Sequence, residues 1–229
     1  MSSSEFFDGR EMLMVHRAFR REFALAPGLV RRVGDGDTLR CRIVSGHLQF
    51  ITTTLHDHHA LEDGTVWPAL LQRIPEKTTR HVREVERQHS TLDVAAAAMS
   101  AAMASWGVGA EAQPRELLAA VLERLASALV EHMDFEERCV VPLMEQHIRR
   151  DEWIQMIQNA ATGLDVDTMP LLFGMNMYEG DSDIVEEVIA SMPSELQPAI
   201  RDMAERAYSQ HAQLIHGTPK PLRSSEVYA

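Results

Sequence analysis

Two stretches of the sequence combine histidines, carboxylates and a proline in the same order. The first, residues 54–68, reads TLHDHHALEDGTVWP, and the second, residues 131–142, reads EHMDFEERCVVP. Each contains a His-x-x-x-Glu pair, a further acid next to the glutamate and a proline six residues after it, and the two copies lie 74 residues apart. The matched residues are His58 and His132, Glu62 and Glu136, Asp63 and Glu137, and Pro68 and Pro142.

The spacing of the His-x-x-x-Glu pairs has a chemical reason. Residues four apart lie on one face of a helix with their Cβ atoms about 5–6 Å apart, so an imidazole nitrogen and a carboxylate oxygen can converge on one ion. A single histidine precedes each copy, His16 in the first case and His89 in the second. Together they form a mixed nitrogen and oxygen ligand set that suits iron, manganese or zinc. No cysteine belongs to the pattern, which excludes a closed thiolate zinc site.

The repetition decides between two interpretations of the motif. One His/Glu pair alone would indicate ordinary surface residues. A second copy, with the same acidic neighbour and the same distant proline, is an internal repeat of the chemistry and favours metal ligands.

Four helices are expected to position these residues. Apolar residues recur with helical period, and Gly, Pro and Asp mark the ends of the periodic segments. Asp37 or Thr38 would cap the second helix, Pro27 marks the end region of the first, and Pro142 would kink the fourth. Short connections between long helices favour an all-α fold, an antiparallel up-down four-helix bundle. The expected helices span residues 9–25, 38–66, 76–106 and 114–147.

The expected bundle occupies residues 9–147 and leaves a long C-terminal part. Residues 148–216 suggest shorter helices broken by Gly, Asp and Pro. They are too apolar for a free tail, so we expect a helical extension that packs on the bundle. Residues 217–229 are expected to form a flexible tail.

Composition narrows the functional classes. Apolar residues make up 45% of the 229 residues, enough for a packed core without disulfides. The net charge of −12 disfavours a nucleic-acid partner, which would require a basic face. Cys41 and Cys139 have no paired or metal-type spacing and fit a reducing compartment. The N-terminus has no signal pattern, and the most apolar window, residues 92–108, is too rich in alanine for a membrane span. We therefore expect a cytoplasmic protein with no membrane partner.

The order His, His-x-x-x-Glu, His, His-x-x-x-Glu over residues 9–147 resembles the hemerythrin-like family, whose domain is also described as the HHE cation-binding domain. The resemblance implies a non-haem di-iron centre inside the bundle, with two iron ions joined by an oxo or hydroxo bridge and by both glutamates; manganese or zinc is the alternative. Ferritin-like di-iron bundles use Glu-x-x-His and more carboxylates than histidines, so they fit less well. Carried over to this chain, the ligands would be His16, His58, Glu62, His89, His132 and Glu136.

One position departs from the family pattern. Oxygen-carrying members have a further histidine one turn after the third-helix ligand, where this chain has Asp93. Without it, two coordination positions of the iron pair stay open; Asp93 as a ligand would leave one. Asp93 could instead hold a ligand imidazole, as could Asp63 and Glu137, whose alternative is a solvated side chain. His56 and His59 are further candidates for a fifth nitrogen ligand. The remaining histidines, expected at the surface because they lack partner spacing, are His47, His81, His147, His211 and His216.

The expected function is the binding or reduction of a small oxidant, O₂, H₂O₂ or NO, at the iron pair. As an enzyme, the protein would be a peroxide-decomposing, catalase-like oxidoreductase or one that reacts with NO or O₂, and the sequence does not separate these activities. The alternative is an iron-sensing or iron-storage module without turnover, whose C-terminal helices present a surface to a partner. The chain would act as a monomer or a homodimer.

Overall fold

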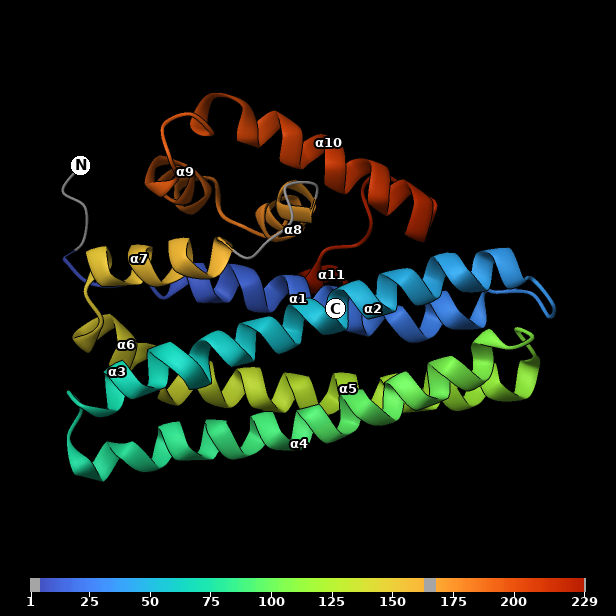
Figure 1. Ribbon diagram of the computed structural model, residues 1–229, viewed down its shortest axis with the longest axis horizontal. Coiled ribbons are helices and arrows are strands. Elements are labelled where there is room, and N and C mark those ends of the chain that lie inside the picture. The colour runs from blue at the N-terminus through green and yellow to red at the C-terminus, as the bar shows by residue number, and fades with distance from the viewer. Residues whose placement is uncertain (1–4, 163–167, 229) are drawn as a thin grey trace.

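The structure is a computed structural model that describes residues 5–162 and 168–228. Its regular elements are helices (Figure 1), and the β-type pairing in the described ranges is a single bridge between Phe6 and Arg149. The all-α fold class expected from the sequence is therefore confirmed. None of the helices in these ranges is long and apolar enough to cross a membrane.

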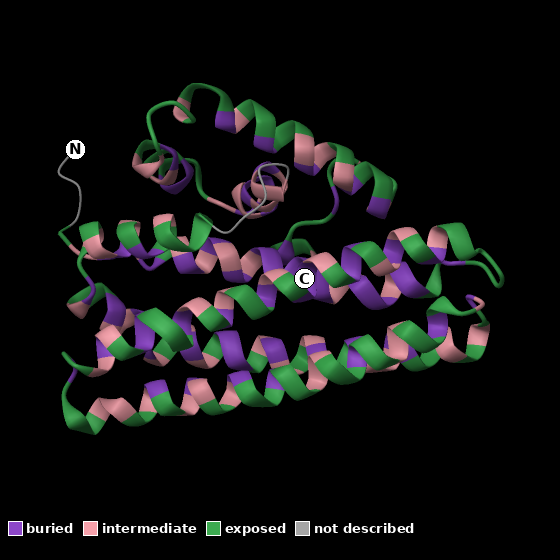
Figure 2. Cartoon of the chain, in the orientation of Figure 1, coloured by how far each residue is buried: buried purple, intermediate pink, exposed green. Residues whose placement is uncertain are grey.

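Four long helices run lengthwise beside one another (Figure 1). α1 and α4 each contact both α2 and α5, so every long helix has two long neighbours. Buried residues gather on the faces that these helices turn towards one another (Figure 2). The four are α1 (Arg10–Arg31), α2 (Thr38–Leu61), α4 (Glu76–Gly107) and α5 (Ala112–Cys139).

Local sequence explains where these helices begin. Asp37 caps α2, because its carboxylate accepts a hydrogen bond from the backbone N–H of Arg40 at 2.9 Å. This bond satisfies one of the free N–H groups of the first helical turn. α4 begins directly after Pro75, and α5 carries Pro114 in its first turn, where a missing N–H is harmless. The first of the two caps considered for α2, Asp37, is thus the one that the fold uses.

α1 does not end near Pro27, as expected from the sequence, but continues to Arg31. A proline inside a helix removes a hydrogen bond and costs about 3 kcal/mol. The last turn offsets this cost, since Leu29 and Val30 are both buried and full burial of each such side chain contributes about 1.5–3 kcal/mol. The expectation was wrong because proline is a local signal, whereas the packing that outweighs it is tertiary.

Pro68 and Pro142 each interrupt a long helix a few residues after a glutamate of the repeated motif. After α2 the chain forms one π-helical turn, η1 (Glu62–Val66), and then α3 (Trp67–Leu71). After α5 it resumes as α6 (Val141–His147). A proline ring collides with the carbonyl four residues before it, so a wider or broken turn is required there. The helix expected over 114–147 is interrupted next to Pro142, where a kink was expected, and the single helix expected over 38–66 is divided where η1 begins.

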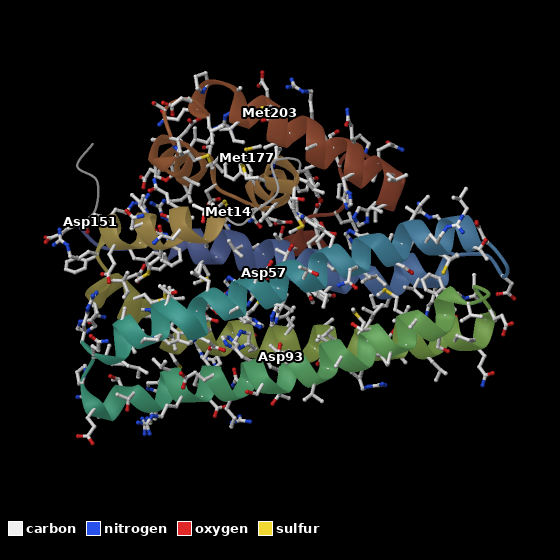
Figure 3. All side chains as sticks on the ribbon, in the orientation of Figure 1. Met14, Asp57, Asp93, Asp151, Met177 and Met203 are labelled. Carbon is white, nitrogen blue, oxygen red and sulfur yellow. The ribbon has the colours of Figure 1, made fainter. Side chains whose placement is uncertain are left out.

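The rest of the chain forms a layer of shorter helices against α1 and α2 (Figure 1). α8, α9 and α11 contact α1, and α10 contacts α2. Met14 on α1 and Met177 on α8 belong to one hydrophobic cluster between these elements (Figure 3). The shorter helices are α7 (Arg150–Ala161), α8 (Thr168–Met177), α9 (Ser182–Ser191), α10 (Gln197–His216) and α11 (Ser224–Val227).

The segment expected as a flexible tail, residues 217–229, is packed as far as it is described. Ser224 in α11 is buried, and its hydroxyl donates to the carboxylate of Glu179 at 2.9 Å. The hydroxyl of Tyr178 donates to the carbonyl of Pro221 at 2.8 Å. The expectation was wrong because the partners of this polar segment lie far from it in the sequence. Residue 229, and residues 163–167 of the expected extension, lie outside the described residues.

Candidate metal centre

Glu62 faces two of the predicted ligand histidines, each from a different helix. One of its carboxylate oxygens lies 3.3 Å from Nε2 of His58, one turn earlier on α2. The other lies 3.5 Å from Nε2 of His89 on α4. The two oxygens therefore point at two different imidazoles, which is the arrangement that a bridging carboxylate requires.

Glu136 faces the other two predicted histidines, but through a single carboxylate oxygen. Its Oε2 lies 3.4 Å from Nε2 of His132, one turn earlier on α5, and 3.9 Å from Nε2 of His16 on α1. The ligand atoms of Glu62, His89 and Glu136 all lie within 4.8 Å of one another, so the two halves form one cluster. The six predicted ligands thus meet from α1, α2 with η1, α4 and α5.

The inward-facing polar atoms of this cluster lack hydrogen-bond partners in the described part of the chain. A buried polar group without a partner costs about 1–3 kcal/mol, and more when it is charged, so their concentration in one place requires an explanation. Cation binding fits, because every atom is an imidazole nitrogen or a carboxylate oxygen. The atoms are Nε2 of His16, His58, His89 and His132, and both carboxylate oxygens of Glu62 and Glu136.

Hydrogen bonds fix the other ring nitrogen of three of these histidines. Each Nδ1 donates to a side-chain oxygen, which leaves the lone pair on Nε2, the atom that faces the cluster. Outer partners of this kind orient ligand imidazoles and raise their basicity. The pairs are His89 with Asp63 at 2.8 Å, His16 with Glu137 at 2.9 Å and His132 with Gln88 at 3.2 Å.

Of the two interpretations of Asp63 and Glu137, the geometry favours the holding of an imidazole over a solvated side chain. Glu137 also accepts a hydrogen bond from Arg20 at 2.6 Å. Burial raises the pKa of Glu137, but the hydrogen bonds from His16 and Arg20 outweigh burial and lower it. The carboxylate is therefore ionised and suited to hold the His16 ring.

Asp63→Ala is expected to lower the metal affinity of the cluster by about 10–100-fold, the usual effect of losing the outer partner of a ligand histidine. The matched control is Asp93→Ala, which removes an exposed carboxylate on the same helix as His89 and should leave the affinity unchanged. Competition with a chromophoric chelator measures both. Equal affinities in the two variants would contradict the role given to Asp63.

Two of the additional candidates, Asp93 and His56, lie outside the cluster. Their side chains are 57% and 67% exposed, and they lie beside each other at the surface, with Asp93 Oδ1 3.7 Å from Nδ1 of His56. Figure 3 marks Asp93 on α4. The buried residue one turn after His89 is Leu92, because α4 turns this neighbouring position inward instead. Neither the ligand role nor the imidazole-holding role suggested for Asp93 fits this placement.

The third additional candidate, His59, is part of the cluster. Its ring stacks on that of His89 with centroids 4.0 Å apart, and its Nε2 is buried without a hydrogen-bond partner among the described residues. The ligand atoms of His59, His89 and His132 lie within 4.8 Å of one another. Burial and the neighbouring imidazoles lower the pKa of His59, so its ring is a neutral base.

Charge is strongly disfavoured in the metal-free cluster. Burial, together with the nearby Glu136 carboxyl, raises the pKa of Glu62 well above its usual value, and burial also raises that of Glu136. Burial and the other imidazoles lower the pKa of His132 to about 2 and that of His58 well below its usual value. Neutral imidazoles can bind a cation directly, whereas the carboxyls must first lose their protons.

Metal uptake is therefore expected to release protons and to strengthen as the pH rises. The fold raises the pKa of Glu62 above 4.5, the pKa of the same group in the unfolded chain. The contribution of Glu62 to the stability of the metal-free chain is therefore fully present below pH 4.5 and is lost as the pH rises through the folded-state pKa. A cation has the opposite preference, since it binds the ionised carboxylate. Calorimetric titration in buffers of different ionisation enthalpy counts the released protons. Uptake that is independent of pH and releases none would contradict this prediction.

Two hydrophobic clusters enclose the site along the helix axes. On α4, Val85 before His89 belongs to one cluster, and Leu92 after it belongs to the other. Leu129 on α5 and Val140, directly after α5, flank the motif in the same way. The apolar side chains on both sides exclude water, which strengthens electrostatic interactions inside the site.

A second buried group of ionisable side chains lies where α1, α2 and α10 meet, and the sequence did not predict it. His47 and His216, both expected at the surface, have ligand atoms within 4.8 Å of each other and of Glu22. His211 contacts His47. No short-range spacing marks this group, because its members come from distant parts of the chain.

A comparison with family models supports the resemblance drawn from the motifs. The model described as hemerythrin HHE cation binding domain matches residues 10–144. This range includes all six predicted ligands and ends within α6. No curated protein and no solved structure matches the chain.

Proposed function

The chain belongs to the hemerythrin HHE cation-binding domain family, and on this premise we propose that it is a non-haem di-iron protein that binds or reduces small oxidants such as O₂, H₂O₂ or NO. We also propose that α1, α2, α4 and α5, over residues 9–147, form the antiparallel up-down bundle of that family. Residues 148–216 would be an extension packed on this bundle. The observation that carries the proposal is the set of unpartnered ligand atoms converging from four helices.

The donor set fits a pair of metal ions. Glu62 and Glu136 would each bridge the two ions, since each carboxylate faces imidazoles from two helices. His16, His58, His89 and His132 would supply the nitrogen ligands. Bound iron would supply two exchangeable electrons and an open position for a small ligand.

His59 is proposed as the fifth imidazole of the centre. The family's oxygen-carrying members place this nitrogen one turn after the third-helix ligand, where the present chain has the exposed Asp93. The stacking of His59 on His89 and its unpartnered Nε2 support this substitution. With five imidazoles, two bridging carboxylates and one oxo or hydroxo bridge on two six-coordinate ions, one coordination position would remain for a small ligand.

The chain's own side chains control the surroundings of this position. Asp63, Glu137 and Gln88 hold three ligand rings with Nε2 directed inward. The hydrophobic clusters on either side keep bulk water out. A small diatomic molecule or peroxide is the class of ligand that a position with apolar surroundings suits.

The test combines metal analysis, absorption and turnover. The native protein is expected to contain two irons and to absorb in the near ultraviolet, as bridged ferric pairs do, while His58→Ala and His132→Ala lose most of the metal. His56→Ala, an exposed histidine on the same helix as His58, is the control and should keep it. Oxygen evolved from peroxide would support the enzyme. A spectral change without turnover would favour a carrier or sensor, and full metal retention in both ligand variants would defeat the assignment.

A further inference from the structure

We propose that Glu22, His47 and His216 form a second, mononuclear metal site that binds a divalent transition-metal ion of the zinc class. Glu22 lies on α1, His47 on α2 and His216 at the end of α10. None of the three belongs to the six-residue cluster, and His216 lies beyond the residues matched by the family model. The site therefore depends on the C-terminal helices.

The three ligand atoms are buried and converge. Oε2 of Glu22 lies 3.3 Å from Nε2 of His47 and 3.4 Å from Nε2 of His216. The side chains are only 1%, 0% and 5% exposed, respectively. None of these three atoms has a hydrogen-bond partner of acceptable geometry among the residues described. Three unsatisfied donor or acceptor atoms, directed at one another, are thus left in the interior.

The separations are those of ligands around one tetrahedral ion. With zinc-to-nitrogen and zinc-to-oxygen distances of about 2.0–2.2 Å, neighbouring ligand atoms of a tetrahedron are about 3.3–3.6 Å apart. Glu22 Oε2 lies at this distance from both imidazole nitrogens. Two histidines and one glutamate are a ligand set that zinc uses, with a fourth position left for water or another small ligand.

The remaining atoms of Glu22 and His47 are already held by other side chains. The other carboxylate oxygen, Oε1, accepts hydrogen bonds from Arg21 at 2.7 Å and from the hydroxyl of Tyr208 at 3.3 Å. Nδ1 of His47 lies 3.0 Å from Nε2 of His211. An Nδ1–H of His47 that donates to His211 leaves the lone pair on Nε2, which is the tautomer that a ligand histidine adopts.

The charge of the surroundings also favours a cation. Arg21 forms ion pairs with both Glu22 and Glu179 at 2.7 Å, and all three side chains are buried. One positive and two negative charges leave the group one positive charge short. Buried charge needs a partner, and a divalent ion bound at Glu22 would supply it.

The test uses the full-length chain in which the first cluster is disabled by His58→Ala and His132→Ala, so that the second site is measured alone. Equilibrium dialysis against Zn²⁺ is expected to give about one bound ion per chain. Adding His216→Ala or His47→Ala should reduce the bound zinc to near zero, whereas adding His147→Ala, a histidine remote from both clusters, should not. Co²⁺ in place of zinc should give the visible absorption of a low-coordinate cobalt ion, and His211→Ala should weaken binding by about 10–100-fold.

Two outcomes would overturn the proposal. The first is that the chain with His58→Ala and His132→Ala binds no zinc. The second is that it binds the same amount of zinc with and without His216 and His47. Either result would mean that Glu22, His47 and His216 form a hydrogen-bond network and not a metal site. Circular dichroism checks that each variant is folded. Should an alanine variant unfold, Glu22→Gln keeps the volume and the bonds to Oε1 while removing the charged ligand, and must still abolish binding. The result is independent of iron in the first cluster, so either proposal can fail alone.

Discussion

Glu62→Gln is expected to lower the metal affinity of the six-residue cluster by more than about 100-fold, and at the same time to stabilise the metal-free chain. Loss of an outer partner already costs about 10–100-fold, and Glu62 faces imidazoles of two helices directly. In the metal-free chain the same carboxyl is a liability, because burial and Glu136 raise its pKa well above the usual value. A neutral amide of equal volume avoids that cost. The metal-free variant should therefore melt at a higher temperature than the metal-free parent. In the presence of metal, the variant should melt at a lower temperature than the parent.

The control for this prediction is Glu131→Gln, next to His132 but exposed to solvent. It removes the same charge from the chain without touching the cluster, so both the metal content and the melting temperatures should match those of the parent. Metal analysis and thermal unfolding with and without chelator measure the effects. A Glu62→Gln chain that keeps its metal, or that is less stable than the parent in both states, would show that Glu62 is an ordinary structural residue.

Arg21→Met is expected to reduce the free energy of unfolding by about 3–5 kcal/mol, the typical effect of removing one partner of a buried ion pair. Arg21 has no exposed surface. Its guanidinium holds Glu22 and Glu179 at 2.7 Å and donates to the carbonyl of Met175 at 3.2 Å. Methionine fills much of the same volume, so the decrease in the free energy of unfolding comes from two buried carboxylates left without a partner and not from a cavity. Chemical denaturation of the full chain measures it.

Arg17→Met is the matched control, one turn earlier on α1. Arg17 is 39% exposed and its closest approach to Asp181 is 3.7 Å, with the aspartate 60% exposed. Exposed pairs of this kind contribute about 0–1 kcal/mol, so its unfolding free energy should stay close to that of the parent. A similar decrease in the unfolding free energy of both variants would mean that positive charge anywhere on α1 stabilises the fold. The buried ion pairs of Arg21 would then contribute no more than the exposed pair of Arg17.

The parts of the site that could be predicted are those encoded by local spacing. Glu62 and Glu136 each follow a histidine by four residues, which brings the pair together on any helix. The doubling of that pattern implied two such helices with their motifs turned towards the bundle axis, and the helical period of the apolar residues located them. His16 and His89 could be added because single histidines precede each copy at nearly equal distances.

The helical period did not predict where the side chain of His59 points, since His59 follows His58 directly. Successive residues on a helix differ by about 100°, so the sequence placed His59 towards a neighbouring helix or solvent without deciding which. In the fold His58 contacts Phe19 on α1, while His59 stacks on His89 of α4. Both directions lead into the interior, because α2 lies between two long helices.

The second cluster could not be predicted from spacing at all. Glu22, His47 and His216 stand on three helices, and the last is far from the others in the sequence. Nothing about His216 itself, near a polar segment and a glycine, distinguishes it from a surface histidine. Only the packing of α10 on α2 brings it inside. Contacts of this kind depend on tertiary arrangement, which a single sequence does not reveal.

The position of α1 affects the order in which the chain can be completed. Phe19 points to the core shared with α2, whereas Arg21, two residues on, binds Glu179, which lies 158 residues further along the chain. Ser224 of α11 binds the same glutamate. During synthesis α1 is therefore made well before Glu179, and until then the guanidinium of Arg21 lacks one of its two carboxylate partners. A nascent chain halted before Glu179 should accordingly exchange the amide protons of α1 faster than the chain described here does.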